Sequence, residues 1–331
     1  MMKILVCGFG RWGANHVRAL RSMELVEVFV ADPSETARAL ARSAGVPEDH
    51  ITARFEDCAA PLNAVDIVTP ADTHFALCLA AIERGLDLFV EKPLCVDPEQ
   101  CIRLADEAYR RGIILQVGHV FRFHPANGHI LRLLRSEALG RLRWISAHFS
   151  SAKTPRSDTG VTWSDSLHFV DLINFLLGAL PRSVMARLSD TGGTGHDDVS
   201  WMSLDYDGVE AEIRADCDGP HKTRELLIHG SAGSLEFDFQ SSRDIRIYQR
   251  SADGSGVGQS DPAQVISCAR SPQPLDAELR CFVGCVAGRA LPPVGAIEAW
   301  QVARILSAAC ESSAQGRRLC IDWKTGAPWW L

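Results

Sequence analysis

Residues 8–13 read Gly8-Phe9-Gly10-Arg11-Trp12-Gly13 and directly follow a short apolar run at residues 3–7. A GxGxxG turn between a strand and a helix lets backbone N–H groups approach a pyrophosphate at the helix N-terminus. Asp32 ends the next apolar run, at the distance where an acid accepts hydrogen bonds from the adenosine ribose hydroxyls. Its charge also repels a 2′-phosphate. Together these features predict a dinucleotide site that prefers NAD to NADP; the alternative is a glycine-rich turn followed by an unrelated acid.

Apolar runs and amphipathic stretches alternate over the first third of the chain. The predicted strands lie at residues 3–7, 26–31, 64–69, 86–90 and 113–117, and the predicted helices follow Gly13 or lie at residues 34–44, 73–84 and 98–111. Such alternation is typical of βαβ units around a parallel sheet. We therefore predict an N-terminal Rossmann domain over residues 1–120.

The pattern changes after residue 120. Strand-like runs lie at residues 142–150, 183–188, 199–206, 209–216, 225–229, 234–239 and 245–249, with helices at 125–136, 165–177, 276–286 and 295–312. Short strands joined by turns such as Asp207-Gly208 predict a mostly antiparallel, open-faced sheet. Residues 251–274 are rich in Gly, Ser, Gln and Pro, and this composition predicts a mobile excursion from the sheet. The fold class is α/β: a Rossmann domain and then, over residues 121–331, an α/β domain for substrate binding and oligomerisation.

Length and composition narrow the possible functions. The 331 residues suit two domains, and the net charge of −7 provides no basic surface for nucleic acid. No apolar run is long enough for a bilayer or a signal peptide, and the eleven cysteines are scattered, so we expect reduced thiols in a cytoplasmic protein. Cys281 and Cys285 lie one helical turn apart, but no matching pair follows at zinc spacing, so no metal site is expected.

Two further motifs follow predicted strands. Thr69-Pro70-Ala71-Asp72-Thr73-His74 comes after the third clear strand, and Glu91-Lys92-Pro93 comes after the fourth. In this order and spacing, the glycine turn and these two motifs resemble the Gfo/Idh/MocA family of oxidoreductases. Residues 118–126 are similar to that family's domain-crossing segment and residues 230–235 to a turn of its C-terminal sheet, so the resemblance covers the whole chain.

The resemblance implies an activity and a set of cofactor contacts. The implied reaction is NAD-dependent hydride transfer to or from a hydroxyl-bearing carbon of a sugar, nucleotide sugar or cyclitol, by a homodimer or homotetramer. Alternatives are a reductase of a non-sugar ketone or imine and a non-catalytic NAD-binding sensor. The residues expected to contact NAD are Gly8, Phe9, Gly10, Arg11, Trp12, Gly13, Asp32, Thr69, Pro70, His74, Glu91 and Lys92.

Lys92 is the first catalytic candidate. It follows the carboxyl end of a predicted parallel strand, where open α/β sheets bind ligands. Its ammonium group can bind a substrate hydroxyl and stabilise the oxygen that gains negative charge during hydride transfer. In the family the Lys-Pro bond is often cis. The alternative is a surface lysine paired with Glu91, a kind of contact that stabilises little.

His168 is the second catalytic candidate. Residues 160–171 resemble the family's Gly-x3-Asp-x3-His-x2-Asp segment, whose histidine is usually the general acid/base, and histidine titrates near neutral pH. The position four before His168 is Ser164, with the acid displaced to Asp165. If the segment is helical, Asp165 and His168 are i,i+3 neighbours and can touch, so Asp165 is expected to take the acid's role; the alternative is that this role is absent. The alternative is a structural histidine.

Other residues are weaker candidates for the substrate site. They are His119, Arg122, Trp163 and Asn174. Arg122 can clamp an anionic substrate group, or link the two domains; Trp163 is equally credible in the core. The Gly-rich residues 192–198 form either a lid or a solvated turn.

Overall fold

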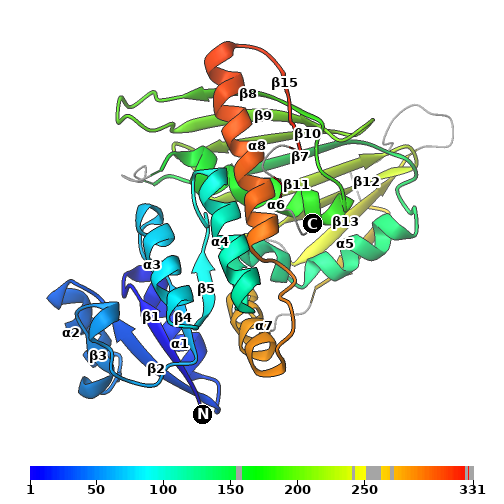
Figure 1. The fold of residues 1–331 in the computed structure, drawn as a ribbon. Coiled ribbons are helices and arrows are strands. Elements are labelled where there is room, and N and C mark those ends of the chain that lie inside the picture. The colour runs from blue at the N-terminus through cyan, green and yellow to red at the C-terminus, as the bar shows by residue number, and fades with distance from the viewer. Residues whose placement is uncertain (154–158, 241–242, 251–261, 269–271, 325–326, 328–331) are drawn as a thin grey trace. The chain divides into compact units, whose positions relative to one another are not determined.

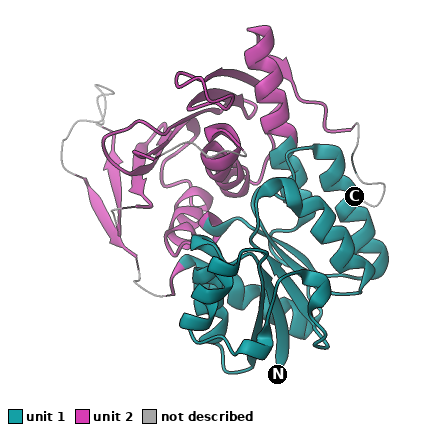
Figure 2. Ribbon diagram, turned by 90° about the vertical axis from the view of Figure 1, so that its left-hand side faces the viewer, with its two compact units in different colours: residues 1–120, 274–303, 326–331 teal, residues 121–273, 304–325 magenta. Residues whose placement is uncertain are grey.

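A computed structural model describes residues 1–153, 159–240, 243–250, 262–268, 272–324 and 327. The chain divides into two compact units, shown in different colours in Figure 2. The first contains Met1–Val120 and Pro274–Ala303, and the second contains Phe121–Gln273 and Arg304–Thr325. The first change of unit falls after Val120, where the sequence places its domain boundary.

The first unit holds a six-stranded parallel sheet in the order β3-β2-β1-β4-β5-β6 (Figure 1). Its strands are β1 (Met2–Cys7), β2 (Val26–Ala31), β3 (Ile51–Thr52), β4 (Ala64–Ile67), β5 (Asp87–Glu91) and β6 (Leu115–Gly118). Its helices are α1 (Arg11–Arg21), α2 (Glu35–Ser43), α3 (Ala71–Glu83), α4 (Pro98–Arg111) and α7 (Pro274–Gly288), with short 3-10 turns at Glu48–His50 and Phe55–Asp57. The predicted Rossmann sheet is confirmed. The strand order reverses between β1 and β4, and ligands of such sheets bind at the carboxyl ends of the strands at this point.

Helix α7 belongs to this unit, although the sequence analysis places its residues in the second domain. Leu279 and Phe282 are fully buried in one core with Leu20 of α1. The ring of Phe282 lies edge-on to Phe89 of β5, with 5.7 Å between the ring centroids. Burying one such side chain stabilises the fold by about 1.5–3 kcal/mol, so α7 packs where its apolar face is covered.

The second unit holds a nine-stranded sheet in the order β14-β13-β12-β11-β7-β10-β9-β8-β15. Its strands are β7 (Leu142–Ser150), β8 (Ser183–Ser189), β9 (Val199–Asp205), β10 (Glu210–Asp216), β11 (Thr223–Gly230), β12 (Gly233–Asp238), β13 (Asp244–Gln249), β14 (Gln264–Ser267) and β15 (Leu319–Cys320). Its helices are α5 (Ala126–Arg135) and α6 (Leu167–Leu177), with a π-helical turn at Thr162–Ser166; a 3-10 turn (Val120–Phe123) and α8 (Ala296–Gln315) run across the change of unit.

All neighbouring strands of this sheet are antiparallel except β7 and β10, which are parallel. The predicted mostly antiparallel sheet is therefore confirmed. Two strands were missed, because β14 lies within the predicted excursion at residues 251–274 and β15 has only two residues. Of that excursion, residues 251–261 and 269–271 lie outside the described residues.

The two faces of the large sheet differ in exposure. Along β7, Ile145, Ala147 and Phe149 are buried, whereas Ser146 and His148 are partly exposed and Trp144 is 38% exposed. Helix α6 packs on the buried face. The edge strand β15 pairs only with the first two residues of β8, and beyond it Ser312 Oγ of α8 accepts a hydrogen bond from the Ala186 N–H of β8, so this N–H is not open to pairing with another strand.

Candidate active site

The predicted site residues divide between the two units. The cofactor residues, Lys92 and His119 lie in the first, whereas Arg122, Trp163, Asp165 and His168 lie in the second.

The glycine turn between β1 and α1 has no room for side chains where the backbone folds back. Gly8 has a φ of +96°, and a Cβ there would lie 2.9 Å from the Val68 carbonyl oxygen. A Cβ on Gly13 would lie 2.0 Å from the Gly8 carbonyl oxygen, whereas a Cβ on Gly10 would meet no atom within 4 Å. The open side of Gly10 and the first N–H groups of the eleven-residue α1 therefore fit an approaching pyrophosphate.

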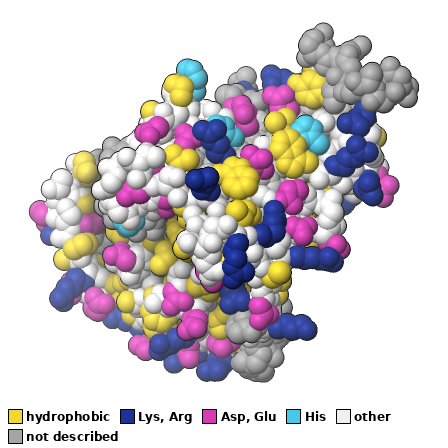
Figure 3. Space-filling model, turned by 90° about the horizontal axis from the view of Figure 1, so that it is seen from above, with side chains coloured by type: hydrophobic (Ala, Val, Ile, Leu, Met, Phe, Trp, Pro, Cys, Tyr) yellow, Lys and Arg dark blue, Asp and Glu magenta, His cyan; other side chains and the backbone are white. Residues whose placement is uncertain are grey.

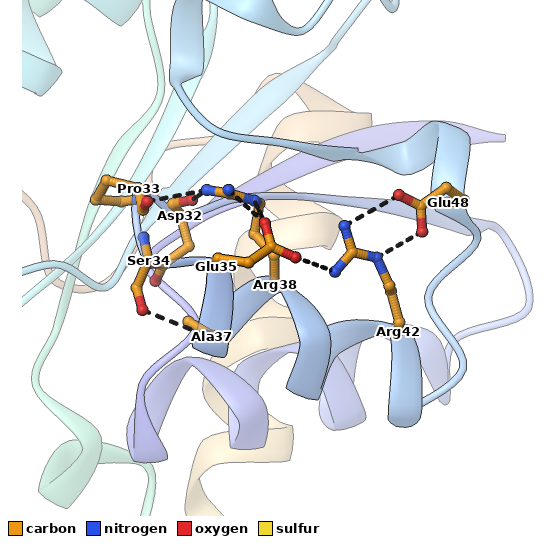
Figure 4. Close-up of polar contacts among 8 residues, drawn as sticks. All are labelled: Asp32, Pro33, Ser34, Glu35, Ala37, Arg38, Arg42 and Glu48. Carbon is orange, nitrogen blue, oxygen red and sulfur yellow. Dashed lines mark hydrogen bonds and ion pairs between the residues drawn. The ribbon is translucent and has the colours of Figure 1, made fainter.

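The Asp32 carboxylate lies at the carboxyl end of β2 and is held by backbone N–H groups. Asp32 Oδ2 accepts from the Phe9 N–H at 2.7 Å and Oδ1 accepts from the Ser34 N–H at 2.8 Å. Figure 4 shows Asp32 beside the start of α2. Each oxygen keeps a further lone pair, which fits the ribose hydroxyls of a dinucleotide whose phosphates lie at the glycine turn.

The nearest guanidinium, that of Arg38, is already occupied. It donates to the carbonyl oxygens of Asp32 and Pro33 at 2.7 and 2.9 Å, and to Glu35 Oε2 at 2.5 Å (Figure 4). Glu35 also accepts from Arg42 at 2.7 Å. With Glu35 binding both arginines and Asp32 alongside, this end of the sheet suits NAD better than a 2′-phosphate.

His74 joins the two motifs that follow β4 and β5. The peptide bond between Lys92 and Pro93 is cis. His74 is buried, with Nδ1 2.8 Å from the Pro93 carbonyl oxygen and Nε2 2.9 Å from that of Thr69. Burial lowers the pKa of His74, and these carbonyls act against it. Because both ring nitrogens contact the protein, the structure favours a positioning role over the predicted cofactor contact.

Glu91, the residue before Lys92, is part of a buried polar chain. The Trp12 indole N–H donates to Glu91 Oε1 at 2.6 Å, and His16 Nε2 lies 3.2 Å from the same oxygen. His16 Nδ1 lies 2.9 Å from Asp66 Oδ2, and both of those side chains are fully buried. Glu91 is only 7% exposed, so it forms no exposed surface pair, although the charge of Lys92 helps to lower the Glu91 pKa. The chain connects the glycine turn to the turn that carries Lys92.

The contacts with Asp66 and Glu91 favour the positively charged form of His16. Burial alone would lower the pKa of His16, but Asp66 and Glu91 outweigh it and raise the pKa to about 10. His16 Nδ1 hydrogen-bonds Asp66, whereas Nε2 makes only an ion-pair contact with Glu91, and a ring between two carboxylates is stabilised in its protonated form. Burial raises the pKa of Asp66, whereas the pKa of Glu91 is lowered because the contacts with His16 outweigh its burial. No motif in the sequence marks this network of buried polar side chains. The one sign of it is an acid, Asp66, inside an apolar strand.

His168 is the second residue of α6, directly after the π-helical turn. Asp197 anchors the start of that turn, because its Oδ2 accepts from the N–H and hydroxyl of Thr162 at 2.8 and 2.7 Å. A Cβ on Gly160 would lie 1.8 Å from Asp197 Oδ1, so only glycine fits there. The His168 ring, 8% exposed, stacks on Phe121 at 4.7 Å and on Phe149 at 5.6 Å.

The structure corrects the role expected of Asp165. Its two carboxylate oxygens accept hydrogen bonds from Lys153 Nζ at 2.7 and 2.5 Å, and its side chain is almost fully buried. The expected i,i+3 contact with His168 assumed α-helical spacing, whereas Asp165 lies in the π-helical turn. Lys153, three residues after β7, is therefore the partner of Asp165. The sequence analysis missed it because it lies in no motif.

The Arg122 side chain is paired with a carboxylate of the protein, that of Asp171. Its Nε and a terminal nitrogen donate to the two oxygens of Asp171 at 2.8 and 2.6 Å. Asp171 is fully buried, so this bidentate pair anchors Arg122 to α6. The pairing with Asp171 argues against an anion clamp at Arg122, and its role stays a prediction.

The other weaker candidates are also held by protein groups. Asn174 Oδ1 accepts from the Tyr206 hydroxyl at 2.7 Å, and Trp163 lies beside Cys310 of α8, where it lowers the pKa of the thiol against the larger effect of burial. His119 is 2% exposed. The Gly-rich residues 192–198 form a turn in which Asp198 accepts from Thr191 and Gly192, as the solvated-turn alternative holds. Within the described ranges, no three His, Cys, Asp or Glu side chains cluster as a metal site.

Comparison with known proteins agrees with both halves of the chain. Residues 2–119 match an oxidoreductase family with an NAD-binding Rossmann fold, and residues 133–321 match the C-terminal alpha/beta domain of the same family. The chain is 29% identical to a UDP-N-acetylglucosamine 3-dehydrogenase of Acidithiobacillus ferrooxidans, over 86% of this chain and 89% of that protein. It is 28% identical to a scyllo-inositol 2-dehydrogenase (NAD+) of Bacillus subtilis, over 98% and 97% of the two chains.

Two solved structures have the same fold. A levoglucosan dehydrogenase in complex with NADH and levoglucosan superimposes with a TM-score of 0.84 at 19% identity, covering 97% of this chain and 99% of that one. The structure of the Acidithiobacillus ferrooxidans dehydrogenase gives a TM-score of 0.80 at 26% identity, covering 95% and 96%.

Proposed function

Since the chain belongs to the Gfo/Idh/MocA family of oxidoreductases, we propose that it moves a hydride between NAD and a hydroxyl-bearing carbon of a sugar, nucleotide sugar or cyclitol. The observation that carries the proposal is the turn holding Lys92 at the carboxyl end of β5, joined to the glycine turn by the Trp12–Glu91 hydrogen bond. The names of the two relatives, dehydrogenases of a nucleotide sugar and an inositol, support this substrate class.

The proposed roles follow from the chemistry of each side chain. NAD, when bound along the glycine turn and Asp32, accepts or supplies the hydride. Lys92 orients the reacting oxygen and stabilises the negative charge that it gains. His168 takes the hydroxyl proton during oxidation and returns it during reduction. The rings of Phe121 and Phe149 cover the His168 imidazole and restrict access of water to it.

Turnover of a panel of sugars, nucleotide sugars and cyclitols, followed by NADH absorbance, tests this proposal. Lys92→Met should lower kcat strongly and leave NADH affinity nearly intact, because Lys92 acts at the reacting oxygen. His168→Ala should lower turnover by roughly two to four orders of magnitude, as expected on removing a positioned proton carrier. Lys3→Met, at the opposite end of the parallel sheet, and His129→Ala on α5 serve as matched controls and should retain activity.

Near-wild-type turnover of Lys92→Met or His168→Ala would remove that residue from the mechanism. NADH binding without turnover of any sugar, ketone or imine would identify a cofactor-binding sensor instead. Turnover confined to non-sugar ketones or imines would place the enzyme in a different substrate class.

We also infer a cytoplasmic homo-oligomer. None of the eleven cysteines, all of them among the described residues, is disulfide-bonded, which suits a reducing compartment. The partly exposed face of the large sheet carries Trp144 stacked on His229, with 5.1 Å between ring centroids, and this face suits a second copy of the chain. Light scattering should give the mass of a dimer or tetramer, and Trp144→Glu should lower it. A monomeric mass for the wild-type chain would contradict the inference.

A further inference from the structure

Among the described residues, Arg224 has no carboxylate partner, and it lies over the Phe149 ring that stacks on His168. Arg224 of β11 is directly opposite Phe149 of β7, so both side chains lie on the buried face of the sheet. The guanidinium carbon of Arg224 lies 3.1 Å from the centroid of the Phe149 ring, and that ring stacks on His168. One terminal nitrogen of Arg224 donates to the carbonyl oxygens of Ser150 and Thr223 at 2.7 and 2.6 Å. These contacts hold the guanidinium in one place.

The acids nearest to Arg224 are engaged elsewhere. Asp165 binds Lys153, whose Nζ lies 5.7 Å from the same Phe149 ring. Asp238 is opposite Glu225 in the ladder between β11 and β12, which places it on the other face of the sheet. There it accepts backbone hydrogen bonds from Arg224 and Gln240 at 3.2 and 2.8 Å. Across the described ranges of the chain, Arg224 forms no ion pair, so the cluster around Phe149 has an excess of positive charge.

This arrangement costs free energy unless an anion offsets it. Burial lowers the pKa of Arg224 to about 10, against the opposing charges of Asp165 and Asp238, so the side chain is still charged at neutral pH. A partly desolvated charge with no counter-ion is unfavourable. A guanidinium held over an aromatic ring, with a second nitrogen and Nε making no hydrogen bond to the described residues, is preorganised for a carboxylate or phosphate.

We propose that Arg224, supported by Lys153, binds an anionic group of the substrate, a carboxylate or a phosphate, and thereby selects acidic sugars or nucleotide sugars over neutral ones. The proposal rests on the proposed function, because it takes His168 as the marker of the substrate site. It moves the expected anion clamp from Arg122, which is paired with Asp171, to Arg224.

Calorimetric binding to the full chain at saturating NADH tests this proposal, because bound NADH keeps the probes out of the glycine turn. One arm compares D-glucuronate with D-glucose, and the other compares UDP with uridine. In at least one arm the anion should bind at least about ten-fold more tightly than its neutral counterpart, a difference of about 1.4 kcal/mol. A preference in the first arm alone identifies a sugar acid, and one in the second alone identifies a nucleotide sugar. The preference should weaken as salt is added.

Variants assign the preference to Arg224. Arg224→Gln should bring the ratio of the affinities for the anion and its neutral counterpart close to one. Arg224→Lys should keep part of the anion preference, since the charge stays but the planar guanidinium is lost. Arg246→Gln, an exposed arginine of β13 paired with Glu236, is the matched control and should keep the full ratio. Thermal unfolding of each variant reports on folding. If Arg224→Gln does not fold, the Arg224→Lys ratio decides the question.

Equal binding of anions and neutral counterparts by the wild-type chain would overturn the proposal. So would an anion preference that Arg224→Gln, or Arg224→Lys in its place, leaves unchanged. Both results differ from failure of the proposed function: turnover of neutral polyols without anion preference overturns only this inference. Anion binding that depends on Arg224, without any NAD-dependent turnover, overturns only the proposed reaction.

Discussion

Asp32 is the residue whose charge acts most directly on the choice between NAD and NADP. Its carboxylate is fixed by two backbone N–H groups, and the arginine beside it is bound to Glu35. A 2′-phosphate in this position would face a like charge, and two such charges about 4 Å apart repel by a few kcal/mol near a protein surface. The geometry therefore favours NADH.

Replacing Asp32 by Ser should narrow the preference for NADH over NADPH by roughly ten-fold or more, because the like charge is removed while a hydrogen-bonding hydroxyl remains. Fluorescence titration with both cofactors measures the ratio of dissociation constants. Asp49→Ser, an exposed acid in the 3-10 turn after α2, is the control and should leave the ratio unchanged. Equal or tighter binding of NADPH by the wild-type chain would overturn this account of Asp32.

Among the elements, α1, β4 and β5 are joined by one charged chain in the interior. His16 comes from α1, Asp66 from β4 and Glu91 from β5, and the two carboxylates lie on either side of the protonated ring. Leaving a buried charge unpaired costs about 3–5 kcal/mol. The three elements are therefore held in a fixed relation below the two turns that carry the glycines and Lys92.

From the buried network of His16, Asp66 and Glu91, we predict that the free energy of unfolding falls at alkaline pH. The pKa of His16 is raised from 6.5 to about 10, so the stabilisation is complete below pH 6.5 and is lost as the pH rises through about 10. His16→Phe should lower the free energy of unfolding by about 3–5 kcal/mol at neutral pH, because Asp66 and Glu91 lose their cation. The free energy of unfolding of His16→Phe should also no longer decline between pH 6.5 and about 10.

Urea denaturation followed by circular dichroism over this pH range measures both effects. His129→Phe on α5 is the control, because the His129 ring hydrogen-bonds Arg132 of its own helix and contacts no carboxylate among the described residues. A wild-type stability that stays level from neutral pH to pH 10 would show that His16 is not charged in the fold.

The π-helical turn before α6 is a second case in which contacts between elements matter more than local pattern. Asp197, from the turn before β9, binds Thr162 and leaves no room for a side chain at Gly160. The Gly-rich residues 192–198 therefore anchor the segment that carries His168. Their own hydrogen bonds to Asp190 and Asp198 hold the turn.

At the scale of the whole molecule, the surface charge indicates which kinds of binding partner the protein suits. On the face in Figure 3, Lys and Arg side chains lie interspersed with Asp and Glu, in keeping with a net charge of −7 and a small-molecule substrate. No helix in the described part of the chain is both long and apolar enough to cross a membrane. Helix α7 extends the first unit's core although it follows the second unit's sheet in the sequence.

The sequence alone determined the features that depend on near neighbours in the chain. Alternating apolar runs and amphipathic stretches predicted every parallel strand of the first unit except the two-residue β3, and the glycine spacing with Asp32 predicted the dinucleotide turn. Both work because strand and helix periodicity, and the space that a tight turn leaves, are local properties. Lys92 and His168 were found by resemblance of their motifs, and their catalytic roles stay predictions.

Only the tertiary structure decided which partner each polar side chain has. Glu91 binds Trp12 and His16, Asp165 binds Lys153, and Arg224 lies over Phe149. The parallel pairing of β7 with β10 and the packing of α7 beside β5 were equally absent from the predictions. In each case the contact joins residues far apart in the chain. It therefore depends on how whole elements pack, which a local sequence pattern does not predict.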